Sequence, residues 1–238
     1  MSFSLRTALT FTAVSAICVT AAGCGGGGSS SSSALAGLSA KQVLSKAVSD
    51  LKSASSFHMA GTVNQGGSIR VDLTYSRGTG CKGTLGIGSK GSVSLLVIGG
   101  TAWLKPDHAY WTSYAGSSAS SVIALIGGKY LKAATSNSNV SGLAQLCNAN
   151  SLASSFTSPK DIVKGGTSTI NGQQALALKD PAKSSAMYVT DTTIPQILRV
   201  TSIRSGSSGR IDFTGYGNAV TLTPPPASET INGAKYGF

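Results

Sequence analysis

The chain has 238 residues and a formal net charge of +11, yet only 11% of its residues are charged. The lysines and arginines are scattered without a run, so we expect a generally basic, solvated surface rather than a dedicated basic patch. Nucleic-acid binding would need basic residues interleaved with aromatic ones on one face, and the most aromatic segment, residues 103–114, holds a single lysine. The composition therefore argues against a nucleic-acid partner.

The N-terminus has the parts of an export signal. Residues 1–6 carry one cation, residues 8–20 form an apolar run, and Ala-Ala-Gly leads directly into Cys24. The run is shorter than the roughly 20 apolar residues of a spanning helix, so we expect cleavage and not a retained transmembrane anchor. The sequence Ala-Ala-Gly-Cys resembles the bacterial lipobox, in which the cysteine thiol receives a diacylglyceryl group.

These features predict a signal peptide over residues 1–23 and a lipid on Cys24, which would hold the protein on the outer face of the cytoplasmic membrane. An ordinary secretory signal is the alternative. Residues 25–33 are all Gly or Ser and behave as a flexible coil, so residues 24–37 are predicted to be a tether. Residues 38–238 are then enough for a single domain with a sizeable core.

Two cysteines remain for the folded domain. Cys18 leaves with the signal and Cys24 takes the lipid, which leaves Cys81 and Cys147 in an oxidising compartment. We predict a disulfide between them, with two buried free thiols as the alternative. Two cysteines and two histidines without a paired spacing such as C-x-x-C do not make a tetrahedral zinc site, so no metal is expected.

The domain begins with a predicted helix over residues 39–55. Ser39 and Gln42 form a capping box, in which each side chain bonds a free backbone N–H of the first turn. Apolar residues then recur at spacings of three and four, which predicts packing on a sheet. They are Val43, Leu44, Ala47, Val48, Leu51 and Ala54.

From residue 57 the apolar period changes to two, which is typical of strands with one buried face. The clearest strand is 68–76, and the strands 92–98 and 101–105 flank a Gly-Gly hairpin turn. Residues 103–114 are expected to form a hairpin that packs on the core. Later strands are predicted at 167–170, 173–179, 186–190, 196–203, 209–214 and 219–223, with three prolines at 224–226 ending the sheet.

Helical spacing returns over residues 117–126 and 142–156, and these two helices are the predicted cover of the sheet. Sequential hairpins make the sheet antiparallel, and so many strands in one sheet would curl. The predicted fold is α+β, mainly β: a strongly curved antiparallel sheet, or half-barrel, with helices covering its concave face.

Motifs for catalysis are missing from the sequence. The hydrolase elbow G-x-S-x-G does not occur, and the one S-x-x-K motif, Ser49 to Lys52, lies in the first helix. The glycines around residue 80 sit in a strand pattern and do not open a helix, so no nucleotide cofactor is expected. His58 and His108 are predicted to be exposed connector residues. We therefore expect a protein that is not an enzyme, with an envelope hydrolase as a weaker alternative.

Several segments between residues 38 and 226 together resemble the actinobacterial LppX/LprG-type lipoproteins, which share the half-barrel of the lipoprotein carriers LolA and LolB. Beside the lipobox and the first helix, they are SFHMAGT, CKGTLGIG, IGGTAWLKPDHAYW, GGKYLKAA, INGQQALALKD, MYVTDTTIPQILRV and GRIDFTGYGNAVTLTPPP. The resemblance implies a hydrophobic cavity between the concave sheet and its helices that holds acyl chains of lipids or lipoglycans.

The expected function is that of a monomeric, membrane-anchored lipoprotein that binds or carries acyl lipid in such a cavity. The alternative is an interaction or sensor lipoprotein with a filled core that binds an envelope partner protein, because apolar residues inside a half-barrel are first of all a core. The candidate cavity residues are Val122, Ile123, Leu125, Ile126, Leu143 and Leu146.

Overall fold

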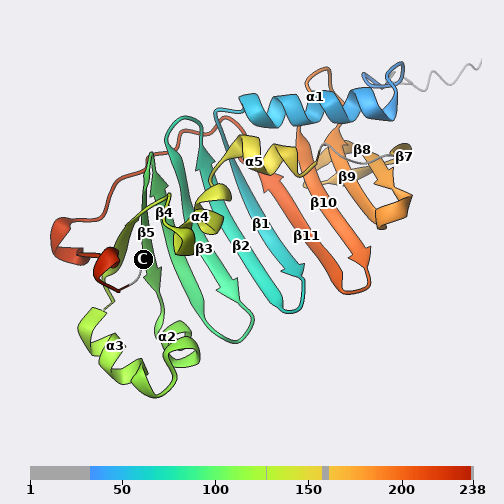
Figure 1. The fold of residues 1–238 in the computed structure, drawn as a ribbon. Helices are drawn as coiled ribbons and strands as arrows, with labels where there is room; N and C mark the ends of the chain where they lie inside the picture. The colour runs from blue at the N-terminus through green and yellow to red at the C-terminus, as the bar shows by residue number, and fades with distance from the viewer. Residues whose placement is uncertain (1–32, 127, 157–160, 237–238) are drawn as a thin grey trace, which may run out of the picture. The chain divides into compact units, whose positions relative to one another are not determined.

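The computed structural model describes residues 33–126, 128–156 and 161–236 (Figure 1). The predicted signal peptide, the lipid site Cys24 and residues 25–32 of the predicted tether lie outside the described residues. Within the described ranges, no helix is both long enough and apolar enough to cross a bilayer.

Twelve strands form one open, curved sheet, as predicted for the fold class (Figure 1). Their order across the sheet is β12-β6-β5-β4-β3-β2-β1-β11-β10-β9-β8-β7, and all neighbours are antiparallel except the parallel pair β12 and β6. The strands are β1 (Ser56–Asn64), β2 (Ser68–Ser76), β3 (Gly80–Ile87), β4 (Ser92–Ile98), β5 (Thr101–Pro106), β6 (Tyr130–Ala134), β7 (Val163–Ile170), β8 (Gln173–Asp180), β9 (Ser185–Thr190), β10 (Ile197–Arg204), β11 (Ser207–Thr214) and β12 (Thr230–Asn232).

Helices lie on the concave face and at the ends of this sheet (Figure 1). The α-helices are α1 (Ala40–Ser53), α2 (His108–Ala115), α3 (Ala119–Ile126), α4 (Ser138–Gln145) and α5 (Ala149–Ser154). Short 3-10 helices are η1 (Gly116–Ser118), η2 (Pro181–Lys183), η3 (Ala227–Glu229) and η4 (Gly233–Tyr236). Buried residues of α1, α4 and α5 share one hydrophobic core with the concave side chains of the sheet.

Helix α1 begins as the sequence predicts. The Ser39 side chain accepts a hydrogen bond from the Gln42 backbone, and the Gln42 side chain accepts one from the Ser39 backbone at 2.8 Å. The helix buries Val43, Leu44, Ala47, Val48 and Leu51, which are five of the six predicted apolar positions. The sixth, Ala54, follows the helix as its C-cap.

The replacement Ser39→Ala is expected to lower the free energy of unfolding by about 1 kcal/mol, since it removes one half of the capping box. Urea denaturation followed by circular dichroism measures the loss. Ser49→Ala is the matched control, because Ser49 is an exposed serine inside the same helix. Equal stability changes in the two variants would contradict a stabilising cap.

Two sequence-predicted hairpins are confirmed. Gly99-Gly100 joins β4 to β5, and Asn171-Gly172 joins β7 to β8 with φ values of 50° and 78°. Positive φ at both central residues is the geometry of a type I′ turn, which matches the twist of the flanking strands. The Asn-Gly pair adopts it at little cost.

Three predicted elements are wrong. Residues 103–114 are not a hairpin, because Asp107 caps a new helix by accepting a hydrogen bond from the Tyr110 N–H at 2.7 Å, so β5 ends at Pro106 and α2 follows. The helix predicted over 142–156 is two helices, since the Asn148 side chain accepts two backbone hydrogen bonds and starts α5 anew. These caps satisfy backbone donors locally and so override the apolar spacing.

The third error is the strand predicted at 219–223. This segment has no ladder partner and runs over the convex face, where the Lys82 ammonium donates to the Thr221 carbonyl at 3.0 Å. The prolines that follow do not end the sheet, because the chain continues to β12, which pairs with β6. Proline lacks the N–H that a ladder needs, and the chain resumes pairing only after the proline run.

The start of the described chain is fixed to the β7 end of the sheet. Leu35 is fully buried, and its backbone N–H donates a hydrogen bond of 3.2 Å to the Asp191 carboxylate. The same carboxylate accepts a hydrogen bond of 2.8 Å from the Ser33 hydroxyl. The Lys164 ammonium on β7 donates to the Leu35 carbonyl at 2.6 Å. Ser33, Leu35 and Ala36, from the end of the predicted tether, are therefore attached to the domain.

Candidate functional site

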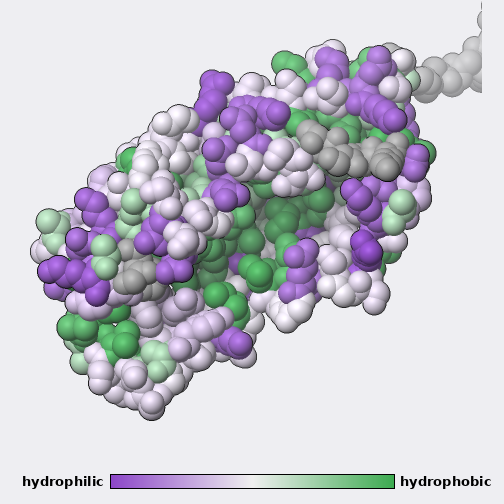
Figure 2. Space-filling view, viewed as in Figure 1, coloured by the Kyte–Doolittle hydropathy of each residue, from purple (hydrophilic) through white to green (hydrophobic). Residues whose placement is uncertain are grey.

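The concave face of the sheet is covered at one end of its strands and open at the other. On β2, Leu73 and Tyr75 are buried beneath the helices, whereas Val71 is half-buried and Ile69 is 41% exposed. These four residues alternate with polar ones and so share the concave face. Figure 2 shows hydrophobic surface on the floor of the hollow that remains open below α4 and α5.

Strand register places apolar residues in a row across this face. Val200 pairs with Ile211, both Ile211 and Val71 pair with Gly61, and Val71 pairs with Leu85. We call the full set the apolar row. In strand order it consists of Leu178, Met187, Val200, Ile211, Gly61, Val71, Leu85 and Val93.

The middle of the apolar row is accessible and its ends are covered. Leu178 and Val93, at the two ends, are buried, while Val200, Ile211 and Val71 are half-buried. With neighbouring strands about 4.8 Å apart, eight strands give a row of roughly 34 Å measured along the curve. The row therefore forms a long apolar strip on the concave face, and the central part of this strip is accessible to solvent.

A pocket of about 390 Å³ lies over the β8–β11 part of the row. Leu44 of α1, Phe156 after α5, and Leu178, Met187 and Val200 from the sheet make its apolar lining. Its rim is polar and includes the ion pair of Asp180 with Lys183, at 3.9 Å, and the cation of Arg204. An apolar floor with a polar rim suits an amphipathic molecule.

A second hollow, of about 610 Å³, lies at the covered end of the strands and has a more polar lining. Lys52 and Arg77 contribute cations to it, and Tyr75 lies in its wall. Burial raises the pKa of the Tyr75 hydroxyl, so this phenol stays protonated at neutral pH. This hollow offers hydrogen-bonding groups and little apolar surface.

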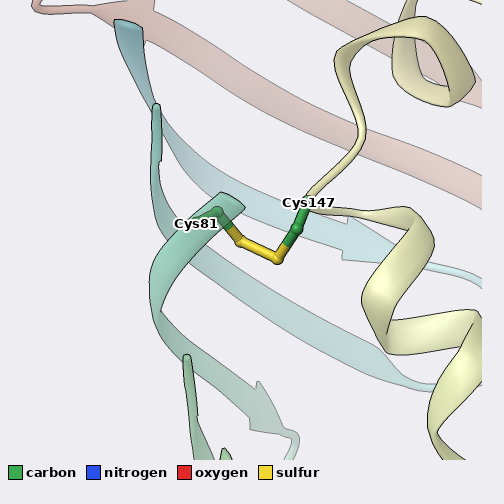
Figure 3. The surroundings of a disulfide bond; sticks show 2 residues. All are labelled: Cys81 and Cys147. Atoms are coloured by element: carbon green, nitrogen blue, oxygen red, sulfur yellow. A yellow bond between two sulfur atoms is a disulfide. The ribbon is translucent and has the colours of Figure 1, made fainter. Parts of the chain in front are cut away.

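A disulfide joins the helical cover to the sheet (Figure 3). Cys81 lies on β3 beside Tyr75 of β2, and Cys147 lies between α4 and α5, with the two Cα atoms 5.0 Å apart. Both cysteines are buried. The pairing that the sequence predicts therefore holds α4 and α5 over the concave face.

The six sequence-predicted cavity residues range from buried to exposed. Ile126 is buried in the main core, and Val122, Leu143 and Leu146 pack against that core while partly exposed. The remaining two are on α3: Ile123 is half-buried, and Leu125 is 61% exposed.

On the concave face, accessible apolar residues of the sheet lie in the middle of the apolar row. Their alternation with polar residues is visible in the sequence, as in the predicted strand 68–76. Alternation shows which residues share a face, but it does not show which part of that face the helices leave open. That depends on where the short helices α4 and α5 end.

The convex face carries paired charges. The Asp212 carboxylate accepts hydrogen bonds from Arg199 and Arg210. Burial alone would raise the pKa of Asp212, but the hydrogen bonds from Arg210 and Arg199 outweigh it, so the pKa is lowered and the carboxylate is ionised at neutral pH. This part of the convex face is therefore charged, in contrast to the apolar row on the other side of the same strands.

The histidines do not form a catalytic group. His58 lies in β1, not in a connector as predicted, and its Nε2 is 3.0 Å from the Asp72 carboxylate on the neighbouring strand. His108 is exposed at the start of α2. No cluster of three potential metal-binding side chains occurs among the residues that the structure describes.

Comparison with known proteins identifies the fold. No family model and no curated protein sequence matches the chain. Among solved structures, LprF from Mycobacterium bovis matches with a TM-score of 0.55 and 16% identity, over 79% of this chain and 97% of LprF. The Mycobacterium tuberculosis lipoprotein LppX matches with a TM-score of 0.50 and 13% identity, over 77% of this chain and 98% of LppX. The chain thus has the LppX-type fold that the sequence resemblance implied.

Proposed function

We propose that this protein is a lipoprotein of the bacterial envelope, anchored through Cys24 to the outer face of the cytoplasmic membrane, that binds or carries acyl lipid on the concave face of its sheet. The observation that carries the proposal is the apolar row, whose central residues Val200, Ile211 and Val71 remain accessible. The fold shared with the lipoprotein LppX and the lipobox-like sequence before Cys24 support it.

The chemistry of the row favours an acyl chain as the ligand. Each buried methylene contributes about 0.8 kcal/mol, so a chain lying along several strands gains affinity in proportion to its length. The rim of the neighbouring pocket supplies the Arg204 cation, which can face a polar or anionic headgroup, while Lys183 is paired with Asp180 at 3.9 Å. The ligand class that fits both features is an amphipathic lipid.

Native mass spectrometry of the full-length protein, purified from a host that processes lipoproteins, tests this function. The spectrum is expected to contain an additional mass that organic extraction releases as acyl lipid. A ligand-free mass, together with crosslinking to an envelope protein in intact cells, would favour the alternative of an interaction lipoprotein.

The variant Val200→Asp is expected to carry at least about tenfold less lipid, because an unpaired carboxylate against an acyl chain costs more than 1.4 kcal/mol. Ile203→Asp is the matched control, since Ile203 lies on the same strand but on the opposite face and is 81% exposed. Thermal unfolding of both variants establishes that they fold. If the two variants carried equal amounts of lipid, the apolar row would not be the binding site.

A further inference from the structure

The helices α2 and α3 form a lobe, residues 108–126, at the end of the sheet away from the start of the described chain. They follow β5, near one edge of the strand order, whereas Leu35 and Ala36 accept hydrogen bonds from Lys164 of β7, at the opposite edge. The two helices pack against each other, and α2 also packs against β4 (Figure 1). We call this pair the α2–α3 lobe.

Helix α3 has a wide apolar face, interrupted only by Ser120 and Ser121, and much of that face is not buried. Its sequence is ASSVIALI, and it buries only Ala119 and Ile126. A wide apolar face on a helix normally packs against a core or lies in the interface of a bilayer. Here Leu125 is 61% exposed, and Figure 2 shows hydrophobic surface over α3.

The neighbouring helix α2 adds aromatic side chains. Tyr110 and Trp111 pack against the core and contact each other, with ring centroids 5.5 Å apart. Tyr114 contacts Tyr110 in a tilted arrangement, with centroids 4.6 Å apart, and is itself 50% exposed. Tyrosine and tryptophan are enriched where proteins meet the interface of a bilayer, because they have an apolar body and a polar end.

The charge around the lobe is positive. No Asp or Glu occurs between residues 108 and 160. Lys90 lies over the Tyr114 ring at 5.6 Å, and Lys129 is exposed just after α3. The Asp107 carboxylate lies at the start of α2 and accepts hydrogen bonds from the Tyr110 backbone N–H and from the backbone N–H and hydroxyl of Ser92.

We propose that the α2–α3 lobe docks on an anionic lipid bilayer, with Leu125 inserted among the acyl chains and Tyr114 at the interface. Each lysine close to an anionic surface contributes about 1 kcal/mol, which complements the apolar contact. A second copy of this chain fits less well, since an isologous contact would bring Lys90 and Lys129 toward the same lysines of the partner copy.

Docking of the α2–α3 lobe would serve lipid transfer, and this purpose rests on the proposed lipid-binding function. The α2–α3 lobe lies at the Val93 end of the apolar row, because α2 packs on β4. A bilayer in contact with the lobe would therefore lie close to one end of the row. Lipid could then pass between the bilayer and the concave face over a short distance.

Tryptophan quenching by brominated lipids tests the docking directly. Leu125→Trp and Ile203→Trp are each introduced into the full-length, processed protein, which is reconstituted in vesicles of brominated phosphatidylcholine with or without brominated phosphatidylglycerol. The wild-type protein reports the quenching of the two native tryptophans. Ile203 is a demanding control, because it is 81% exposed and lies on β10, close to the tethered edge.

The additional quenching in Leu125→Trp is expected to be at least about twofold stronger than in Ile203→Trp, and stronger with phosphatidylglycerol than without it. Equal quenching of the two variants would overturn the docking proposal. Quenching of Leu125→Trp that is independent of phosphatidylglycerol would overturn its electrostatic part. Bound lipid is measured separately by mass spectrometry, so loss of docking and loss of lipid binding give different results.

Discussion

Replacing Cys81 and Cys147 together by alanine is expected to lower the free energy of unfolding by about 4 kcal/mol. The disulfide closes a loop with a sequence separation of 66, and its removal frees that loop in the unfolded chain. Both cysteines are buried, so the two missing sulfur atoms add to the loss. For a domain of this size the melting temperature should fall by roughly 8 to 16 °C.

Urea denaturation of the wild type and of the double alanine variant measures this effect. The denaturant dependence should become steeper in the variant, since its unfolded state exposes more surface. Wild-type protein unfolded in a reductant should behave like the variant, which controls for the changed side chains. Unchanged stability in both cases would mean that the bond contributes nothing to the fold.

The disulfide also bears on the proposed site. It holds the α4–α5 segment to β3, and this segment determines how much of the concave face is covered. The double alanine variant should therefore expose more of the concave face. Faster amide exchange in α5 than in α1 would show that the cover loosens locally before the sheet unfolds.

Phe57→Ala is expected to cost about 3 to 5 kcal/mol of unfolding free energy. Phe57 is 1% exposed and stacks on Tyr75, with centroids 4.8 Å apart, while the rings of Phe213 and Tyr216 lie at 6.0 Å each. Its removal leaves a cavity among three other rings. Chemical denaturation quantifies the loss.

Phe156→Ala is the matched control for this aromatic cluster. Phe156 contacts Phe213 edge to face at 6.5 Å, but it is only half-buried and lines the pocket over the apolar row. This variant should lose much less stability than Phe57→Ala and should change lipid occupancy instead. Similar stability losses would mean that Phe156 belongs to the core and not to the site.

The sequence by itself determined the local elements that rely on nearby residues. The capping box at Ser39, the Asn171-Gly172 turn and the alternation along residues 68–76 each depend on contacts within a few positions, and each is found in the structure. The curved antiparallel sheet could be predicted because many short strands linked by tight turns have few other ways to bury one face.

Only the tertiary structure decided which apolar residues stay accessible. Val200 and Val71 come from distant parts of the chain, and they meet in one row because β11 and β1 pair between them. The apolar spacing of residues 117–126 and 142–156 indicated helices but not their neighbours, so Leu125 was assigned to a cavity although it lies at the surface. A pattern of apolar residues records which face avoids water, whereas the packing partner that covers this face is set by long-range pairing.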